Sequence, residues 1–358
     1  MRAILLNPGP VSLSEAVRKA AVSDDLCHRE PEFARLQERV RGGLLDVYGC
    51  DPATWAAVPL GGSGTTALEA MLSSLLGRDA RLLVIENGVY GERIRRIAEI
   101  HGVDFHSLEH DWTAPIDFGR VERALAEGHF SHLAAVHHET TTGRLNDVAR
   151  LALLCEAHGV ELLLDAVSSF GAEALPFDSP ALSACAATAN KCLHGIPGLC
   201  FVVARRSALH NGAQPPRSLY LHLPLWLEKQ DQASTPFTPP VNGLLALDKA
   251  LDELRAQGGW RARNARYARL AGRVRRALGG LGVESLLPAD ESSAVLTAYR
   301  IPRGMSYEAI HDGLKQWGFV IYAGQGALAA TLFRISTMGD ITDYDMERLL
   351  AAIQSVFQ

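Results

Sequence analysis

A lysine at position 191 stands in a stretch of small residues, and its surroundings favour chemistry by its amine. Four alanines lie within the seven positions before Lys191, and they leave little room for water and supply no anion. A lysine held away from water loses proton affinity, and its neutral amine can then attack an aldehyde. The competing interpretation is an ordinary surface lysine, because lysine side chains are usually exposed.

An aspartate at the end of an apolar run is the second candidate. Asp165 follows Leu162–Leu164 and lies 26 positions before Lys191. A carboxylate in such a place is costly to bury without a cationic or protonated partner, and a protonated ring nitrogen is one such partner. A helix cap or a bond to nearby backbone explains the same residue without a ligand.

A glycine-rich segment, residues 60–66, separates an apolar run from a helical pattern. Its sequence is Leu-Gly-Gly-Ser-Gly-Thr-Thr. Glycines that admit close approach, followed by a helix start with hydroxyl residues, form a cup for a phosphate. The segment has neither the lysine of a nucleoside-triphosphate loop nor the G-x-G-x-x-G spacing. An ordinary capped helix accounts for it equally well.

Three cationic residues are candidates for binding an anion. His28 and Arg29 lie in a polar loop, and Arg334 stands in the otherwise apolar stretch 333–336, where it needs an internal or a bound acceptor. His137 and His138 are adjacent, so on a strand they would point to opposite faces. We therefore expect no metal site.

Short apolar runs alternate with amphipathic helical patterns, which predicts an α/β domain with a mostly parallel sheet. Functional groups should gather at the carboxyl ends of the strands. A proline-rich crossing before residue 240 suggests a large domain over residues 15–240 and a smaller α+β domain over 241–358 together with 1–14. The expected strands of the large domain are 56–60, 82–85, 103–108, 133–138, 160–165 and 199–203.

The composition is that of a globular protein with a large core. The chain has 358 residues, of which 47% are hydrophobic, so it can form two domains. A net charge of -5 without a basic block disfavours nucleic acid as a partner. No signal peptide and no membrane span are evident, and the six cysteines lack zinc spacing. We expect a cytoplasmic protein with reduced thiols.

Taken in order, these features resemble the class V branch of the fold-type I pyridoxal phosphate enzymes, over nearly the whole chain. The resemblance implies a large domain with a mostly parallel sheet of the seven-stranded type. Two blocks, Ala189–Cys192 and Gly318–Tyr322, are typical of the subgroup that transfers the amine of 2-aminoethylphosphonate to pyruvate. The other matching motifs are Asn7–Pro10, His137–Gly143, Asp165 with Ser168–Gly171, and Gly195 with Pro197 and Gly198.

The resemblance implies roles for individual residues. Lys191 would bind the cofactor aldehyde covalently and, once displaced, move a proton, while Asp165 would keep the ring nitrogen protonated. Arg334 would bind the carboxylate of the keto acid. The implied cofactor contacts are Ser63, Gly64 and Thr65 at the phosphate, Tyr90 stacked on the ring, Thr140 at the ring oxygen, and Thr238 at the phosphate of a neighbouring subunit. Val167 also belongs to the implied cofactor-binding set, and Asn190 is expected to shape the site.

The implied reaction converts 2-aminoethylphosphonate and pyruvate to phosphonoacetaldehyde and alanine in phosphonate catabolism, on a homodimer. Arg334, Arg29 and His28 are the candidates for the phosphonate. An alanine:glyoxylate or serine:pyruvate aminotransferase of the same class is the alternative. A cysteine desulfurase would need a cysteine in the C-terminal part, and none follows Cys200. A non-catalytic α/β protein that binds a small anion is the most distant alternative.

Overall fold

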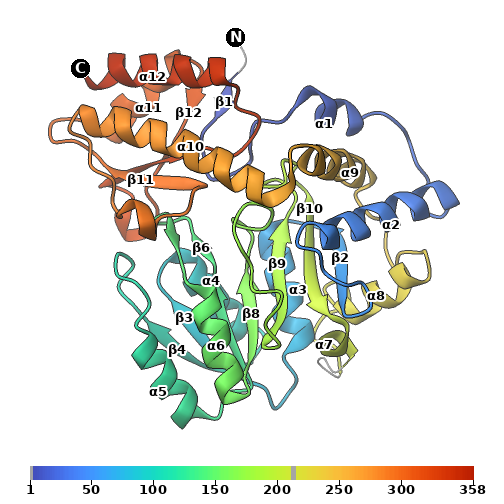
Figure 1. Cartoon of the computed structure of the whole chain (residues 1–358). Coiled ribbons are helices and arrows are strands. Elements are labelled where there is room, and N and C mark those ends of the chain that lie inside the picture. The colour runs from blue at the N-terminus through green and yellow to red at the C-terminus, as the bar shows by residue number, and fades with distance from the viewer. Residues whose placement is uncertain (1–2, 211–214) are drawn as a thin grey trace.

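The computed structural model describes residues 3–210 and 215–358, and a seven-stranded sheet forms its centre (Figure 1). The strand order is β2-β10-β9-β8-β5-β3-β4. Strands β9, β8, β5, β3 and β4 run parallel to one another, and β10 is antiparallel to both β9 and β2. The predicted mostly parallel α/β sheet is therefore confirmed. The strands are β2 (Trp55–Gly61), β3 (Arg81–Glu86), β4 (Asp104–Glu109), β5 (His132–Val136), β8 (Glu161–Asp165), β9 (Leu182–Thr188) and β10 (Leu199–Arg205).

Helices cover both faces of this sheet because side chains of a strand alternate between the faces. In β3, Leu83 and Ile85 join one buried cluster, whereas Leu82 and Val84 join the other. The first cluster is closed by α2 (Pro31–Asp46), α5 (Phe118–Gly128), α6 (Val148–His158) and α9 (Val241–Ala256). The second is closed by α3 (Gly64–Leu75), α4 (Val89–Ile100), α7 (Arg206–His210) and α8 (Leu223–Asp231).

One strand of the sheet was not expected from the sequence. The run before Lys191 forms β9, in which every residue is buried. Alanine, serine and threonine dominate it, so it lacks the large β-branched and aromatic residues that mark most strands. Its small side chains let α3 pack closely against the strand. The segment forms a strand because the sheet and its helices bury it on both faces, and the local sequence does not show this burial.

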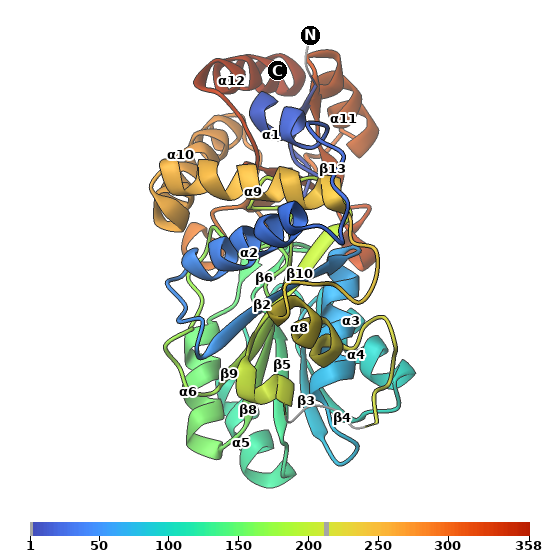
Figure 2. The ribbon, with the colours of Figure 1, turned by 90° about the vertical axis from the view of Figure 1, so that its right-hand side faces the viewer.

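The C-terminal region forms a second layer above the large sheet (Figure 2). Its sheet has the order β11-β14-β13, and strand β1 pairs in parallel with β12. Ile4 and Leu6 therefore share a buried cluster with residues of 270–353. The elements are β1 (Ile4–Leu5), α1 (Glu15–Ala20), α10 (Gly259–Gly280), β11 (Leu296–Arg300), α11 (Tyr307–Gln316), β12 (Phe319–Val320), β13 (Tyr322–Ala323), β14 (Leu332–Ser336) and α12 (Asp343–Phe357).

The division into domains at residues 240 and 241 stays a prediction. Helix α9 begins at that point, and its leucines pack into the core under the large sheet beside α2. In Figure 2 these two helices lie between the sheet and the C-terminal layer. Within residues 3–210 and 215–358, no helix combines the length and the apolar character that crossing a membrane requires.

Candidate active site

A cavity of about 180 Å³ opens where the carboxyl ends of β8 and β9 meet the start of α3. The carboxyl ends of parallel strands lie at the same edge of a sheet, so residues distant in sequence converge there. Eight of the residues singled out in the sequence line the cavity together. The lining consists of Ser63, Gly64, Thr65, Leu68, Tyr90, Arg93, Asp165, Val167, Thr188, Asn190 and Lys191.

Lys191 follows β9 in a tight turn. The backbone N–H of Gly195 donates to the carbonyl of Ala189 at 2.8 Å, and that of His194 donates to the carbonyl of Lys191 at 2.9 Å. The amine Nζ of Lys191 donates to Ser168 Oγ at 3.3 Å. Burial lowers the pKa of the lysine to about 8, from an ordinary 10.5. The side chain thus carries a neutral amine far more often than an exposed lysine does.

Asp165 ends β8 with only 4% of its surface exposed. Its Oδ1 accepts a hydrogen bond from the N–H of Val167 at 2.9 Å. Burial raises the pKa of the carboxyl, whereas that N–H and the nearby charges of Arg93 and Lys191 lower it. The carboxylate is anchored at one oxygen and faces the same cavity as the lysine.

Glu139 lies within the motif His137–Gly143, but the sequence reasoning gave it no role in the site. It lies in β6 (His138–Glu139), which pairs with β7 (Arg144–Leu145), and it is fully buried. One carboxylate oxygen accepts from the N–H of Tyr90 at 3.1 Å, and the other accepts from the N–H and Oγ1 of Thr141 at 3.0 and 2.6 Å. Burial raises the pKa of Glu139 to about 7. The carboxylate thereby fixes the first turn of α4, which carries the aromatic ring of the cavity.

Thr140 and Arg334 meet beside the cavity. Arg334 Nη1 donates to the carbonyl of Thr140 at 2.9 Å and to Gln325 Oε1 at 3.2 Å, and its Nε donates to the carbonyl of Ala323 at 2.9 Å. The positive charge of Arg334 also lowers the pKa of Lys191. The hydroxyl of Thr140 is buried and has no hydrogen-bond partner within the described parts of the chain. Backbone carbonyls and one amide oxygen of the protein therefore accept some of the N–H groups of Arg334, and no internal carboxylate is among the acceptors described here.

Five predicted residues do not line this cavity: Thr140 and Arg334, described above, and also His28, Arg29 and Thr238. His28 packs edge-on against Phe33, and Arg29 Nη1 donates to the carbonyl of Thr235 at 3.0 Å. Thr238 is exposed in the crossing that follows α8. A role for these residues toward a second copy of the chain stays a prediction.

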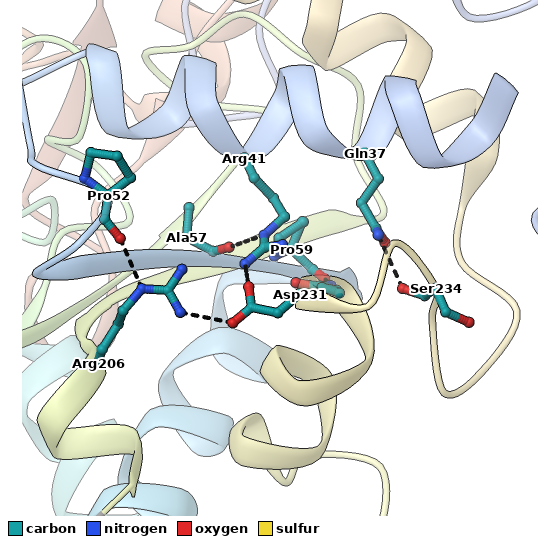
Figure 3. A network of polar contacts seen from close by, with 9 residues as sticks. Gln37, Arg41, Pro52, Ala57, Pro59, Arg206, Asp231 and Ser234 are labelled. Carbon is teal, nitrogen blue, oxygen red and sulfur yellow. Dashed lines mark hydrogen bonds and ion pairs between the residues drawn. The ribbon is translucent and has the colours of Figure 1, made fainter. Parts of the chain in front are cut away.

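Two side chains of α2 and Arg206 of α7 hold the end of α8 and the start of that crossing in place (Figure 3). Arg41 and Arg206 both bind the carboxylate of Asp231, at 2.5 and 2.7 Å. Gln37 Nε2 donates to the carbonyl of Ser234 at 3.0 Å. The start of the crossing is thus fixed against both α2 and the large sheet.

Arg93 is a second residue that the sequence reasoning missed. It lies three positions after Tyr90, so both side chains share one face of α4, and both line the cavity. The spacing from an aromatic residue already singled out was the available signal.

Comparison with known proteins agrees with this arrangement. The aminotransferase class-V family model matches residues 23–347. The chain is 34% identical to the 2-aminoethylphosphonate–pyruvate transaminase of Phocaeicola vulgatus, covering 99% of this chain and 98% of the relative. It is 38% identical to the protein of that name from Syntrophobacter fumaroxidans, covering 98% and 95%.

Solved structures give the same result. An aspartate aminotransferase from Thermus thermophilus superposes with a TM-score of 0.90 at 27% identity, covering 99% of each chain. Pyridoxamine-pyruvate aminotransferase from Mesorhizobium loti superposes with a TM-score of 0.90 at 28% identity, covering 99% of this chain and 92% of that one. The chain belongs to the class V aminotransferases, which share the fold-type I architecture and use pyridoxal phosphate as their cofactor.

Proposed function

We propose that this protein transfers the amino group of 2-aminoethylphosphonate to pyruvate, which yields phosphonoacetaldehyde and alanine in phosphonate catabolism. The observation that carries the proposal is similarity over nearly the full length to several proteins that bear this name. The cavity supplies matching chemistry, because the half-buried amine of Lys191, whose pKa is lowered, and the buried carboxylate of Asp165 line it together.

The residues present suit pyridoxal phosphate. The buried hydroxyl of Thr140 lacks a partner among the described residues, as expected of a group that meets a ring oxygen. Gly64 lies so near Val167 that a β-carbon there would stand 2.7 Å from Val167 Cγ1. Ser63, Gly64 and Thr65 open helix α3, whose backbone N–H groups suit a phosphate.

Each residue then has a definite task. Bound pyridoxal phosphate supplies the aldehyde that takes up the amino group and a ring that accepts electrons. The neutral amine Nζ of Lys191, oriented by Ser168 Oγ, carries a proton to and from the reacting carbon. Asp165 keeps the ring nitrogen protonated, and Arg334 binds the carboxylate of pyruvate.

We further propose a homodimer in which Thr238 reaches the phosphate in the neighbouring subunit. Two observations support it: Thr238 is exposed, and the crossing that carries it is held by the contacts to Asp231 and Ser234. A cytoplasmic location stays a prediction from the sequence.

The test is an absorbance spectrum of the cofactor-loaded protein before and after addition of an amino donor. We expect 2-aminoethylphosphonate to convert the bound pyridoxal phosphate to pyridoxamine phosphate at concentrations where alanine and serine do not. Lys191→Ala should abolish rapid conversion. A protein that binds the cofactor but reacts only with alanine or serine would instead act as an alanine:glyoxylate or serine:pyruvate aminotransferase.

A further inference from the structure

Arg93 projects into the cavity from the second turn of α4. Its Nη1 donates to Thr65 Oγ1 at 3.2 Å, and its guanidinium carbon lies 4.6 Å from the centroid of the Tyr90 ring. The arginine therefore bridges the aromatic side of the cavity and the first turn of α3. Stacking on the ring fixes the plane of the guanidinium.

Arg93 has no carboxylate partner among the described residues, whereas the neighbouring arginines of α4 form ion pairs. Arg95 Nε lies 3.2 Å from a carboxylate oxygen of Glu86, and Arg96 Nη1 lies 2.9 Å from one of Glu99. Across residues 3–210 and 215–358, no carboxylate lies within ion-pair distance of Arg93. A guanidinium has five N–H donors, and one of them serves a neutral hydroxyl here.

The surrounding groups favour one kind of ligand for the remaining donors. Gly64 and Thr65 begin α3, so the positive end of a twelve-residue helix points to the same space. Asp165 is the acidic side chain lining the cavity, and it is anchored on the N–H of Val167. An arginine beside a helix N-terminus, with Lys191 on the same cavity, suits a tetrahedral oxyanion with about two negative charges.

We propose that Arg93 binds such a dianionic tetrahedral group within the cavity. The two sources of this chemistry are the phosphate of the cofactor and the phosphonate of the amino donor, and only the second rests on the function proposed above. Arg334 is distinct from this position, because its contacts are the carbonyls of Thr140 and Ala323 and the amide of Gln325.

The experiment compares Arg93→Gln with Arg96→Gln, which removes the same charge from an exposed position of the same helix. Calorimetry on the cofactor-free protein measures affinity for inorganic phosphate, pyridoxal phosphate and pyridoxal. Calorimetry on the cofactor-loaded protein measures affinity for methylphosphonate and acetate, and steady-state kinetics give the KM for 2-aminoethylphosphonate. Arg93→Lys, which keeps the charge, serves as a second variant if Arg93→Gln folds poorly.

If Arg93 binds the cofactor phosphate, Arg93→Gln lowers the affinities for inorganic phosphate and pyridoxal phosphate at least 10-fold and leaves the affinity for pyridoxal unchanged. If Arg93 binds the phosphonate, Arg93→Gln lowers the affinity for methylphosphonate and raises the KM for 2-aminoethylphosphonate, each at least 10-fold. The affinities for acetate and for the cofactor then stay within twofold. The proposal is overturned if all affinities stay within twofold of the wild type. It is also overturned if the affinities for pyridoxal and acetate fall as much as those for the dianions. Failure of the wild-type protein to use 2-aminoethylphosphonate would sink the proposed function, yet phosphate binding would still decide the role of Arg93.

Discussion

The backbone of Gly9 lies directly against the side chain of Lys191: a β-carbon at Gly9 would stand 2.7 Å from Cδ and 2.8 Å from Cε of the lysine. Gly9 also has a φ of +120°, which side-chain-bearing residues rarely adopt. Residues 7–10 form a bend that ends at Pro10, rather than the extended segment that two prolines suggested. The N-terminal segment thus forms one wall around the amine.

Replacing Gly9 by alanine should displace Lys191. A shift of about 1 Å in a reacting group can cost about 100-fold in rate, and we expect a loss of kcat of that order for Gly9→Ala. The control is Gly304→Ala, at a φ of +88° with no heavy atom within 4 Å, which carries backbone strain without crowding. Equal losses in the two variants would show that strain, and not contact with the lysine, is responsible.

The lowered pKa of Lys191 predicts a pH dependence in the cofactor-free protein. With a pKa of about 8 in place of 10.5, the neutral amine is about 300-fold more abundant at pH 7 than in an exposed lysine. The rate of pyridoxal phosphate capture should therefore rise with pH through about 8 and then level off. A rate that keeps rising to pH 10 would contradict the lowered pKa.

The same shift has a consequence for stability. Between about pH 8 and 10.5 the unfolded chain binds a proton that folded Lys191 does not, so the free energy of unfolding should rise with pH over this window. Denaturant unfolding of the cofactor-free protein measures it. Lys191→Met should remove that part of the slope.

Glu139→Gln should loosen the ring that stacks in the cavity. Both carboxylate oxygens accept hydrogen bonds, from the N–H of Tyr90 and from Thr141, and an amide can replace only one of them as an acceptor. We expect pyridoxal phosphate to bind about 10-fold more weakly, since a lost hydrogen bond costs about 1.4 kcal/mol. Glu308→Gln, on exposed α11, is the control, and matching affinities in all three proteins would refute the positioning role.

Asp231→Asn should weaken the attachment of the crossing. The carboxylate is shared by Arg41 and Arg206 and is partly exposed, so we expect a loss of about 1 to 2 kcal/mol in the free energy of unfolding. Glu228→Gln on the same helix removes an exposed pair with Lys229 and should leave the free energy of unfolding unchanged within error. If Thr238 serves a neighbouring subunit, pyridoxal phosphate affinity falls in Asp231→Asn alone.

The sequence predicted the architecture because most strands carry a strong apolar pattern, as in β5 and β8. It also placed Asp165 at the carboxyl end of a strand, where functional groups were expected, and the structure shows that Lys191 follows the neighbouring strand β9 and lines the same cavity. Strand β9 escaped notice because alanines report burial poorly. Glu139 was given no role because its importance lies in a contact with Tyr90, which is distant in sequence. Arg93 was overlooked although it lies three positions after Tyr90, and its contact with Thr65 becomes visible only in the fold.

Pairing of β1 with β12 joins residues 4–5 to residues 319–320. The first strand that the ribosome makes therefore cannot pair until nearly the whole chain has been synthesised. The large sheet, complete once β10 has emerged, can assemble earlier. Docking of β1 is what brings Asn7–Pro10 up to Lys191. During synthesis the reactive amine would therefore stay open on that side until the chain is nearly finished, which ties the onset of activity to the end of translation.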